Sequence, residues 1–119
     1  MVRVNKNIVL DKSFQFSLNT VQFCKMLIED RKEYILSKQL MKSGTSIGAN
    51  IVEAQSAESK QDFVHKLSSS LKEARETKYW ILLISKGDYV TTEKVDSLLK
   101  AIEELISLLV SIIKSSKKP

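Results

Sequence analysis

The stretch Ser43-Gly44-Thr45-Ser46-Ile47-Gly48-Ala49-Asn50-Ile51-Val52-Glu53-Ala54 decides the fold of this chain. Within it and just before it, apolar and small residues recur at steps of three and four, the spacing of one face of a helix. These residues are Leu36, Leu40, Ser43, Ile47, Ile51 and Ala54. Gly44 and Gly48 lie beside that face, although each costs about 1 kcal/mol against alanine in a helix interior. We therefore expect a second backbone to pack closely on this helix at the two glycines.

Outside this stretch, apolar spacing predicts three further helices. The four predicted helices cover residues 13–31, 33–54, 60–86 and a last segment from Thr91 or Thr92 to about residue 115. Four helices of similar length with short connections predict an all-α fold, an antiparallel up-down-up-down four-helix bundle. We expect a single domain over residues 1–119, with a short N-terminal extension at 1–11 and a basic C-terminal tail at 114–119.

The apolar spacing also predicts which side chains of the outer helices point inward. For the first helix, capped by Asp11 or Ser13, the predicted inner stripe is Phe14, Leu18, Val21, Cys24 and Ile28. For the third helix, capped by Ser59 or Ser56, it is Phe63, Leu67, Ser70, Ala74, Thr77, Ile81 and Ile84. Gly87-Asp88 should end that helix. Asn50 and Glu53 lie beside the inner stripe of the second helix and should form hydrogen bonds to a neighbouring helix or loop.

The fourth predicted helix carries more apolar residues than a surface helix of a monomer needs. At about 100° per residue, its apolar residues between 95 and 113 cover an arc of roughly 200°. A stripe of about 100° is sufficient for one side of a bundle helix. Two interpretations stay open, which are self-association of the chain and a central position of this helix in a monomer.

Composition limits the class of protein further. The chain has 119 residues, 43% of them hydrophobic, a single proline and a formal net charge of +5 with a pI near 9.3. Cys24 has no second cysteine to pair with and should be a buried thiol. No leader and no membrane-spanning apolar run is recognisable, so we expect a cytoplasmic protein without a membrane partner.

The sequence lacks the residue patterns of catalysis and of metal binding. Ser46, His65 and Asp62 could be assembled into a triad only as they could in most sequences, and His65 should lie on the surface. The Glu-x-x-His pairs of metal-binding bundles are missing. We therefore expect that the protein is not an enzyme, has no catalytic residue and binds no metal or cofactor.

Charge is distributed unevenly around the third predicted helix. At about 100° per residue, its basic residues other than Lys66 share an arc of roughly 120°, and its acidic residues gather in another of roughly 60°. The basic set is Lys60, Lys72, Arg75, Lys78 and Lys86, with Tyr79 on the same side, and the acidic set is Glu58, Asp62, Glu73 and Glu76. Such a surface could follow the phosphates of a nucleic acid. The alternative is an ordinary solvated face with ion pairs along the helix.

Two blocks of the sequence resemble the four helix bundle protein family, also called the 23S rRNA-intervening sequence protein family. The first block is Ser46-Ile47-x-x-Asn50-Ile51-x-Glu53-Ala54, within the glycine-containing helix. The second comprises Phe63-x-x-x-Leu67, Ser70, Glu73, Glu76-Thr77 and Gly87-Asp88-Tyr89. The resemblance extends from about Phe14 to Ile113. The chain departs from it at Ala54, where glycine is common, and at Lys42, where arginine is common.

The resemblance implies a four-helix bundle that assembles into a homo-oligomeric ring, commonly a pentamer. Some members are encoded within insertions in large-subunit rRNA genes, and relatives are basic accessory proteins of reverse transcriptases that associate with nucleic acid. The leading hypothesis is therefore a non-enzymatic homo-oligomer that binds RNA or DNA nonspecifically. Its proposed contacts are Lys42, Lys72, Arg75, Lys78 and Lys86. The alternative is a scaffold or accessory subunit that binds a partner polypeptide and no nucleic acid.

Overall fold

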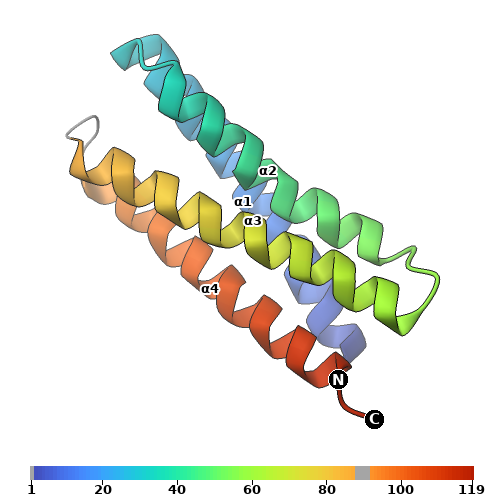
Figure 1. The fold of residues 1–119 in the computed structure, drawn as a ribbon. Helices are drawn as coiled ribbons and strands as arrows, with labels where there is room; N and C mark the ends of the chain where they lie inside the picture. Colours follow the sequence, from blue (N-terminus) through green and yellow to red (C-terminus); the bar gives the residue numbers. More distant parts are fainter. Residues whose placement is uncertain (1, 88–91) are drawn as a thin grey trace.

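The computed structural model describes residues 2–87 and 92–119 and folds them into four α-helices (Figure 1). The helices are α1 (Val2–Arg31), α2 (Ile35–Ala54), α3 (Lys60–Lys86) and α4 (Thr92–Ser116). The described residues contain no β-strand. The predicted all-α four-helix bundle is confirmed. No helix in the described ranges is long and apolar enough to cross a membrane.

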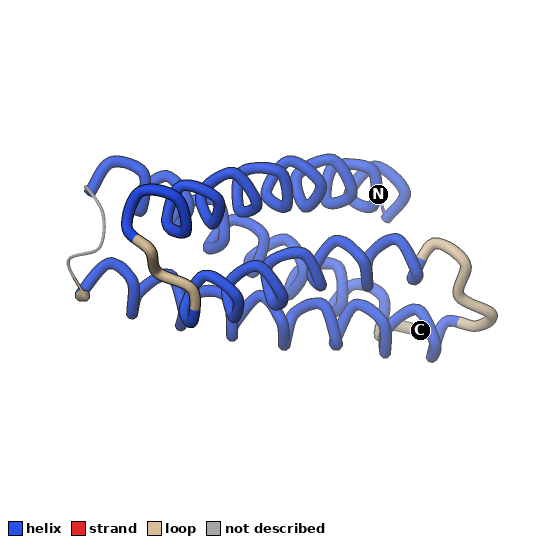
Figure 2. The backbone as a smooth tube through the Cα atoms, turned by 90° about the horizontal axis from the view of Figure 1, so that it is seen from above, coloured by secondary structure: helices blue, strands red, loops and turns tan. Residues whose placement is uncertain are grey.

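Each helix packs against two neighbours, so the four helices form a square in cross-section. α1 contacts α2 and α4, and α3 contacts the same two helices from the opposite side. The α2–α3 connection and both ends of the chain lie at one end of the bundle (Figures 1 and 2). The bundle measures 49 × 21 × 19 Å, as expected for helices that lie lengthwise beside one another. All four helices contribute side chains to one continuous hydrophobic core.

The first helix differs from its prediction in length and in orientation. α1 begins at Val2, so residues 2–11 belong to this helix and are not an extension, and neither Asp11 nor Ser13 caps it. Of the predicted inner stripe only Cys24 is buried, whereas Phe14 is 65% and Leu18 is 43% exposed. Within residues 8–31, where side-chain burial is described, the buried residues are Val9, Ser13, Phe16, Thr20, Phe23, Cys24 and Leu27. The helix is therefore turned relative to the prediction, and Phe14 and Leu18 face outward.

The small residues on this buried face explain its orientation, because they pack against the glycines of α2. A Cβ atom on Gly44 would lie 2.9 Å from Cγ2 of Thr20. One on Gly48 would lie 3.5 Å from Oγ of both Ser13 and Ser17. Nearby, the thiol of Cys24 donates a hydrogen bond of 3.3 Å to the carbonyl oxygen of Ser37. The close approach predicted for the two glycines is confirmed, and the partner is α1.

The connection between α1 and α2 is short and is closed by one carboxylate. Lys32 takes a left-handed conformation with φ of 55° and ends α1. Glu33 then accepts hydrogen bonds from the backbone N–H groups of Ile35, Leu36 and Ser37 at 2.8–3.2 Å. The first turn of a helix has N–H groups without partners in the helix, and a carboxylate satisfies them and interacts favourably with the helix dipole. α2 therefore starts two residues later than predicted, with Tyr34 at the N-cap position and the Glu33 carboxylate bonded to the N–H groups of its first turn.

The glycine-containing stretch forms the second half of α2 and faces the core as predicted. Leu40, Ser43, Ile47, Ile51 and Ala54 are buried. The hydroxyl of Ser70 donates to the carbonyl oxygen of Ile47 at 2.8 Å, and that of Thr77 lies 2.9 Å from Oγ of Ser43. The polar groups of α2 are thus tied to α3 inside the core.

The remaining polar residues of the same stretch form hydrogen bonds at its surface. Glu53 reaches the neighbouring helix as expected, since its Oε1 lies 2.9 Å from Nζ of Lys66. Asn50 instead donates to the carbonyl oxygen of Ser46 in its own helix, and Ser46 donates to that of Lys42. The expectation of a contact with a neighbouring helix therefore holds for Glu53 and is wrong for Asn50.

α4 uses its wide apolar arc within its own chain. Val95, Leu98, Ile102, Leu105, Leu109, Ile112 and Ile113 are buried, and Leu99, Ala101, Ile106 and Leu108 pack against the core. Among the large apolar side chains of this helix only Val110, at 37%, counts as exposed. The width of the arc therefore follows from packing against both α1 and α3. Thr91, the alternative predicted start of this helix, lies outside the described residues.

Candidate nucleic-acid interface

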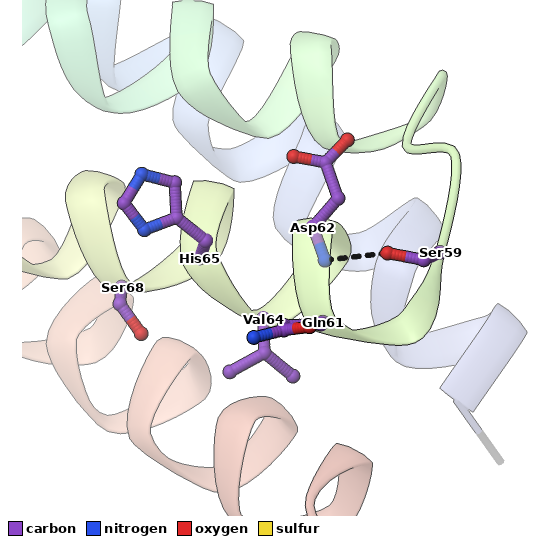
Figure 3. Close-up of a pocket in the computed structure, with 6 residues that line it drawn as sticks. All are labelled: Ser59, Gln61, Asp62, Val64, His65 and Ser68. Atoms are coloured by element: carbon purple, nitrogen blue, oxygen red, sulfur yellow. Dashed lines mark hydrogen bonds between the residues drawn. The ribbon is translucent and has the colours of Figure 1, made fainter.

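The candidate interface depends on α3, whose ends and buried face match the prediction. Ser59 caps the helix by accepting a hydrogen bond from the N–H of Asp62 at 3.0 Å (Figure 3). The helix ends at Lys86, and the N–H of Gly87 bonds back to the last turn. Asp88 and Tyr89, predicted to follow in the turn, lie outside the described residues. The inward residues are those predicted, with Phe63 only partly buried. The opposite face of α3 is therefore directed to solvent.

Three of the predicted contact residues share this outer face. At about 100° per residue, Lys72, Arg75 and Lys86 fall within an arc of roughly 60°, and Tyr79 lies between them. All four side chains are exposed, Tyr79 by 58%. Within the part of the chain that the structure describes, none of the three cations forms an ion pair. We call Lys72, Arg75, Tyr79 and Lys86 the basic face of α3.

Lys78 is on the same helix but points toward α4. Its Nζ lies 3.2 Å from Oε2 of Glu103, and the side chain is half-buried. Lys12 of α1 is neutralised in the same way by Glu104 at 3.1 Å. Surface pairs of this kind contribute little to stability, but they offset charge that a polyanion could otherwise use. Lys78 therefore belongs to the α3–α4 contact and lies at the edge of the basic face.

Lys42 is exposed but lies on α2, so it is separated from the basic face. The flank of α3 that faces α2 is marked by Lys66, whose ammonium bonds to Glu53. That hydrogen bond, and the charge of Glu53 behind it, raises the pKa of Lys66. Glu73 lies two turns further along the same flank, about 20° from Lys66. Glu73 therefore adds negative charge to the flank of α3 that carries Lys66.

Tyr79 of the basic face packs against the neighbouring aromatic residue, Trp80. The rings of Tyr79 and Trp80 lie 5.0 Å apart in an edge-to-face arrangement, with an angle of 72° between them. The indole N–H of Trp80 donates to Oε2 of Glu76 at 3.1 Å. Edge-to-face pairs of this kind are favourable, and Trp80 itself packs against the core. Tyr79 thus presents an oriented ring to solvent beside Arg75.

A shallow hollow of about 550 Å³ lies at the start of α3 (Figure 3). It contains Asp62, His65 and Ser68, which are residue types of hydrolytic sites. No hydrogen bond joins these three side chains in the described structure, and the Asp62 carboxylate accepts one from the N–H of Glu58 at 3.2 Å. His65 is exposed, as predicted, and Ser46 lies on α2. The hollow brings together no nucleophile, base and orienting group.

A surface that the sequence reasoning did not identify lies on the outer side of α1. Phe14 and Leu18, four residues apart on one side of this helix, are exposed there by 65% and 43%. In the described chain these side chains have no covering element. Exposed apolar residues that gather on one side often mark an interaction surface. The signal was present in the sequence, but the apolar spacing of Phe14, Leu18 and Val21 equally suits an inner stripe.

The fold and the basic face define a four-helix bundle with one cationic helix surface. The chain belongs to the 23S rRNA-intervening sequence protein family, whose sequence model matches residues 5–111. Its structure is similar to that of a protein of unknown function from the S23 ribosomal protein family of Bacteroides thetaiotaomicron, with a TM-score of 0.90. The two are 46% identical, and the similarity covers 92% of this chain and 98% of the other. No curated protein is similar enough to count as a relative.

Proposed function

We propose that this protein is a non-enzymatic, cytoplasmic homo-oligomer that binds RNA or DNA nonspecifically through phosphate contacts on α3. The observation that carries the proposal is which lysine and arginine side chains form ion pairs with carboxylates and which do not. Lys12, Lys66 and Lys78 are offset by carboxylates, whereas Lys72, Arg75 and Lys86 have no acidic partner within the described residues. Cations without partners on one face can replace the counterions of a polyanion.

Tyr79 supports a single-stranded ligand over a duplex. An aromatic ring beside a basic track can stack on an unpaired base of any sequence. Its exposure of 58% leaves that ring accessible. Lys42 and Lys78 would contribute only at the margins, since one lies on another helix and the other is paired with Glu103.

Self-association is the second part of the proposal, and the surface that we propose for it lies on α1. α4 buries most of its apolar arc inside its own chain, so it no longer requires a partner. Phe14 and Leu18 present an apolar surface that a second copy of the chain would cover. The ring of five copies remains an inference from family membership.

A gel-shift series with single-stranded RNA and DNA at increasing salt concentration tests the nucleic-acid proposal. We expect binding that weakens steeply with salt and shows little sequence preference. Absence of binding at about 50 mM salt would refute it, because electrostatic binding is strong under those conditions.

The alternative function is a scaffold that binds a partner polypeptide, for example a reverse transcriptase, and the apolar surface on α1 favours it. The two functions differ in their response to nuclease. A defined partner protein that is retained on the purified chain after nuclease treatment, together with a negative gel shift, would support the scaffold.

A further inference from the structure

A shallow cavity of about 450 Å³, open to solvent, lies at the end of the bundle where the α2–α3 connection meets the end of α4. Its polar lining includes Gln55, Ser59, Lys60, Ser116 and Lys118. A second cavity of about 390 Å³ adjoins it, shares Lys60 and Ser116, and adds Lys117. No acidic residue lines either cavity. This end of the molecule is separate from the basic face of α3, since Lys72 lies about 18 Å further along the helix axis.

The lysine side chains make both cavities cationic. Nζ of Lys60 donates a hydrogen bond of 2.7 Å to the carbonyl oxygen of Lys118, which holds the ammonium group beside the cavities. Lys60, Lys117 and Lys118 form no ion pair with any residue that the structure describes. Asp62, the acidic residue in the first turn of α3, lines the hollow of Figure 3, and its carboxylate accepts a hydrogen bond from the N–H of Glu58.

The start of α3 adds the positive end of a long helix. Ser59 satisfies the N–H groups of Asp62 and Phe63 through its hydroxyl and carbonyl oxygens. The N–H groups of Lys60 and Gln61, the first two residues of the helix, have no acceptor within the described structure. N–H groups at a helix start, together with the helix dipole, favour an anion.

A buried hydroxyl supplies an independent sign of a missing partner. Ser116 is only 9% exposed and lines both cavities, and its Oγ is buried without any hydrogen-bond partner. A buried hydroxyl without a partner is unfavourable, and such groups normally bond to protein, water or ligand. An anion between Lys60 and Ser116 would accept a hydrogen bond from this hydroxyl.

We propose that this end of the bundle binds a phosphate group through Lys60, Ser116 and Lys117. Phosphate offers several acceptor oxygens and a charge that the lysines would offset. The group could be inorganic phosphate or the terminal phosphate of a nucleic-acid strand. The site does not depend on the basic face of α3, so it can exist whether or not that face binds nucleic acid.

An NMR titration of the full chain with sodium phosphate at constant ionic strength tests the site. We expect saturable shifts of the amide signals of residues 59–61 and 115–118. K60Q and S116A should each weaken binding by about tenfold, the effect of losing one hydrogen bond to a charged group. K100Q, which removes an exposed lysine elsewhere on α4, should leave the affinity unchanged. Shifts that do not saturate, or that are equally sensitive to K100Q, would overturn the proposal.

Thermal unfolding gives a second readout for the same serine. S116A should raise Tm in phosphate-free buffer, because it removes a buried hydroxyl without a partner, and it should abolish most of the stabilisation by phosphate. A variant that is less stable without phosphate and equally stabilised by it would contradict the role of Ser116.

A further binding experiment distinguishes inorganic phosphate from the terminal phosphate of a nucleic-acid strand. In the K72Q/R75Q/K86Q variant, which lacks the cations of the basic face, we compare short oligothymidylates with and without a 5′-phosphate. Tighter binding of the phosphorylated strand, lost in K60Q, assigns a strand terminus. Equal weak binding of both strands, with phosphate still bound, assigns inorganic phosphate.

Discussion

Cγ2 of Thr20 lies 2.9 Å from the position that a Cβ atom would occupy on Gly44, closer than two carbon atoms approach without a clash. On Gly48, one turn further along α2, the same atom would lie 3.5 Å or more from its neighbours. The two glycines therefore differ, although both lie on the face of α2 that meets α1.

G44A and G48A should have opposite effects on stability. Both substitutions gain about 1 kcal/mol in helix propensity, but only the methyl group of G44A overlaps a buried side chain. Overpacking of this kind costs about 1–3 kcal/mol. We expect G48A to exceed G44A by about that amount in free energy of unfolding, measured by urea denaturation. T20S, which deletes Cγ2, should rescue G44A, and equal stabilities of the two alanine variants would contradict the close contact.

K32G should stabilise the bundle. Lys32 has φ of 55°, a left-handed conformation that costs an ordinary residue about 1 kcal/mol and glycine almost nothing. We expect K32G to raise the free energy of unfolding by up to about 1 kcal/mol, with Tm as the simplest readout. K32A removes the same side chain but keeps the Cβ atom, so it should give no such gain.

Cys24 should make stability depend on pH in the alkaline range. Burial, assisted by the negative charge of Glu33, raises the pKa of its thiol from 9.0 to about 12. Between these values the unfolded chain ionises the thiol and the folded protein does not. The stabilisation is therefore complete below about pH 9 and declines as the pH rises toward 12.

Comparison with C24A isolates this effect from the titration of lysines and tyrosines. From about pH 8 to about pH 10.5, the wild type should lose about 2 kcal/mol more in free energy of unfolding than C24A does. Parallel losses in the two proteins would show that the folded thiol ionises normally.

The salt dependence of nucleic-acid binding should report the basic face. K72Q/R75Q/K86Q should reduce the slope of log affinity against log salt by about 2, since each lost contact to single-stranded phosphate accounts for about 0.7. The control K25Q/K38Q/K100Q removes the same net charge from the exposed surfaces of α1, α2 and α4. An equal loss in the control would mean that the net charge, and not the basic face, governs binding.

The outer side of α1 should govern self-association. F14Q/L18Q should lower the mass measured by light scattering, because it removes apolar surface that a second copy would cover. L82Q/L83Q, which changes two exposed leucines on α3, serves as the matched control and should leave the mass unchanged. A monomeric wild type would contradict the proposed oligomer.

α2 and α3 could be predicted from the sequence because one apolar face dominates each of them. Their inward residues were correct, and Ser59 was correctly identified as one of two possible caps of α3. The start of α2 could not be predicted. It depends on the Glu33 carboxylate, which bonds to three backbone N–H groups, and apolar spacing does not report such bonds.

The orientation of α1 could not be predicted because the helix carries two apolar stripes. Val9, Phe16, Phe23 and Leu27 form one, and Phe14, Leu18 and Val21 form another, with similar spacing. Which stripe faces inward depends on Ser13 and Thr20, because these residues pack against Gly48 and Gly44 on a different helix. Likewise, the neutralisation of Lys78 depends on the alignment of α3 with α4, which no local pattern specifies.

The two hydrogen bonds that join α2 and α3 inside the core have a consequence for how the helices slide past one another. Apolar side chains alone would permit a shift by one turn, about 5.4 Å, at modest cost. Such a shift would separate Ser70 from the carbonyl oxygen of Ile47 and Thr77 from Ser43, leaving buried polar groups without these partners. These bonds therefore fix the register of the bundle: they contribute little to net stability, but they select one alignment among several that the hydrophobic core would accept.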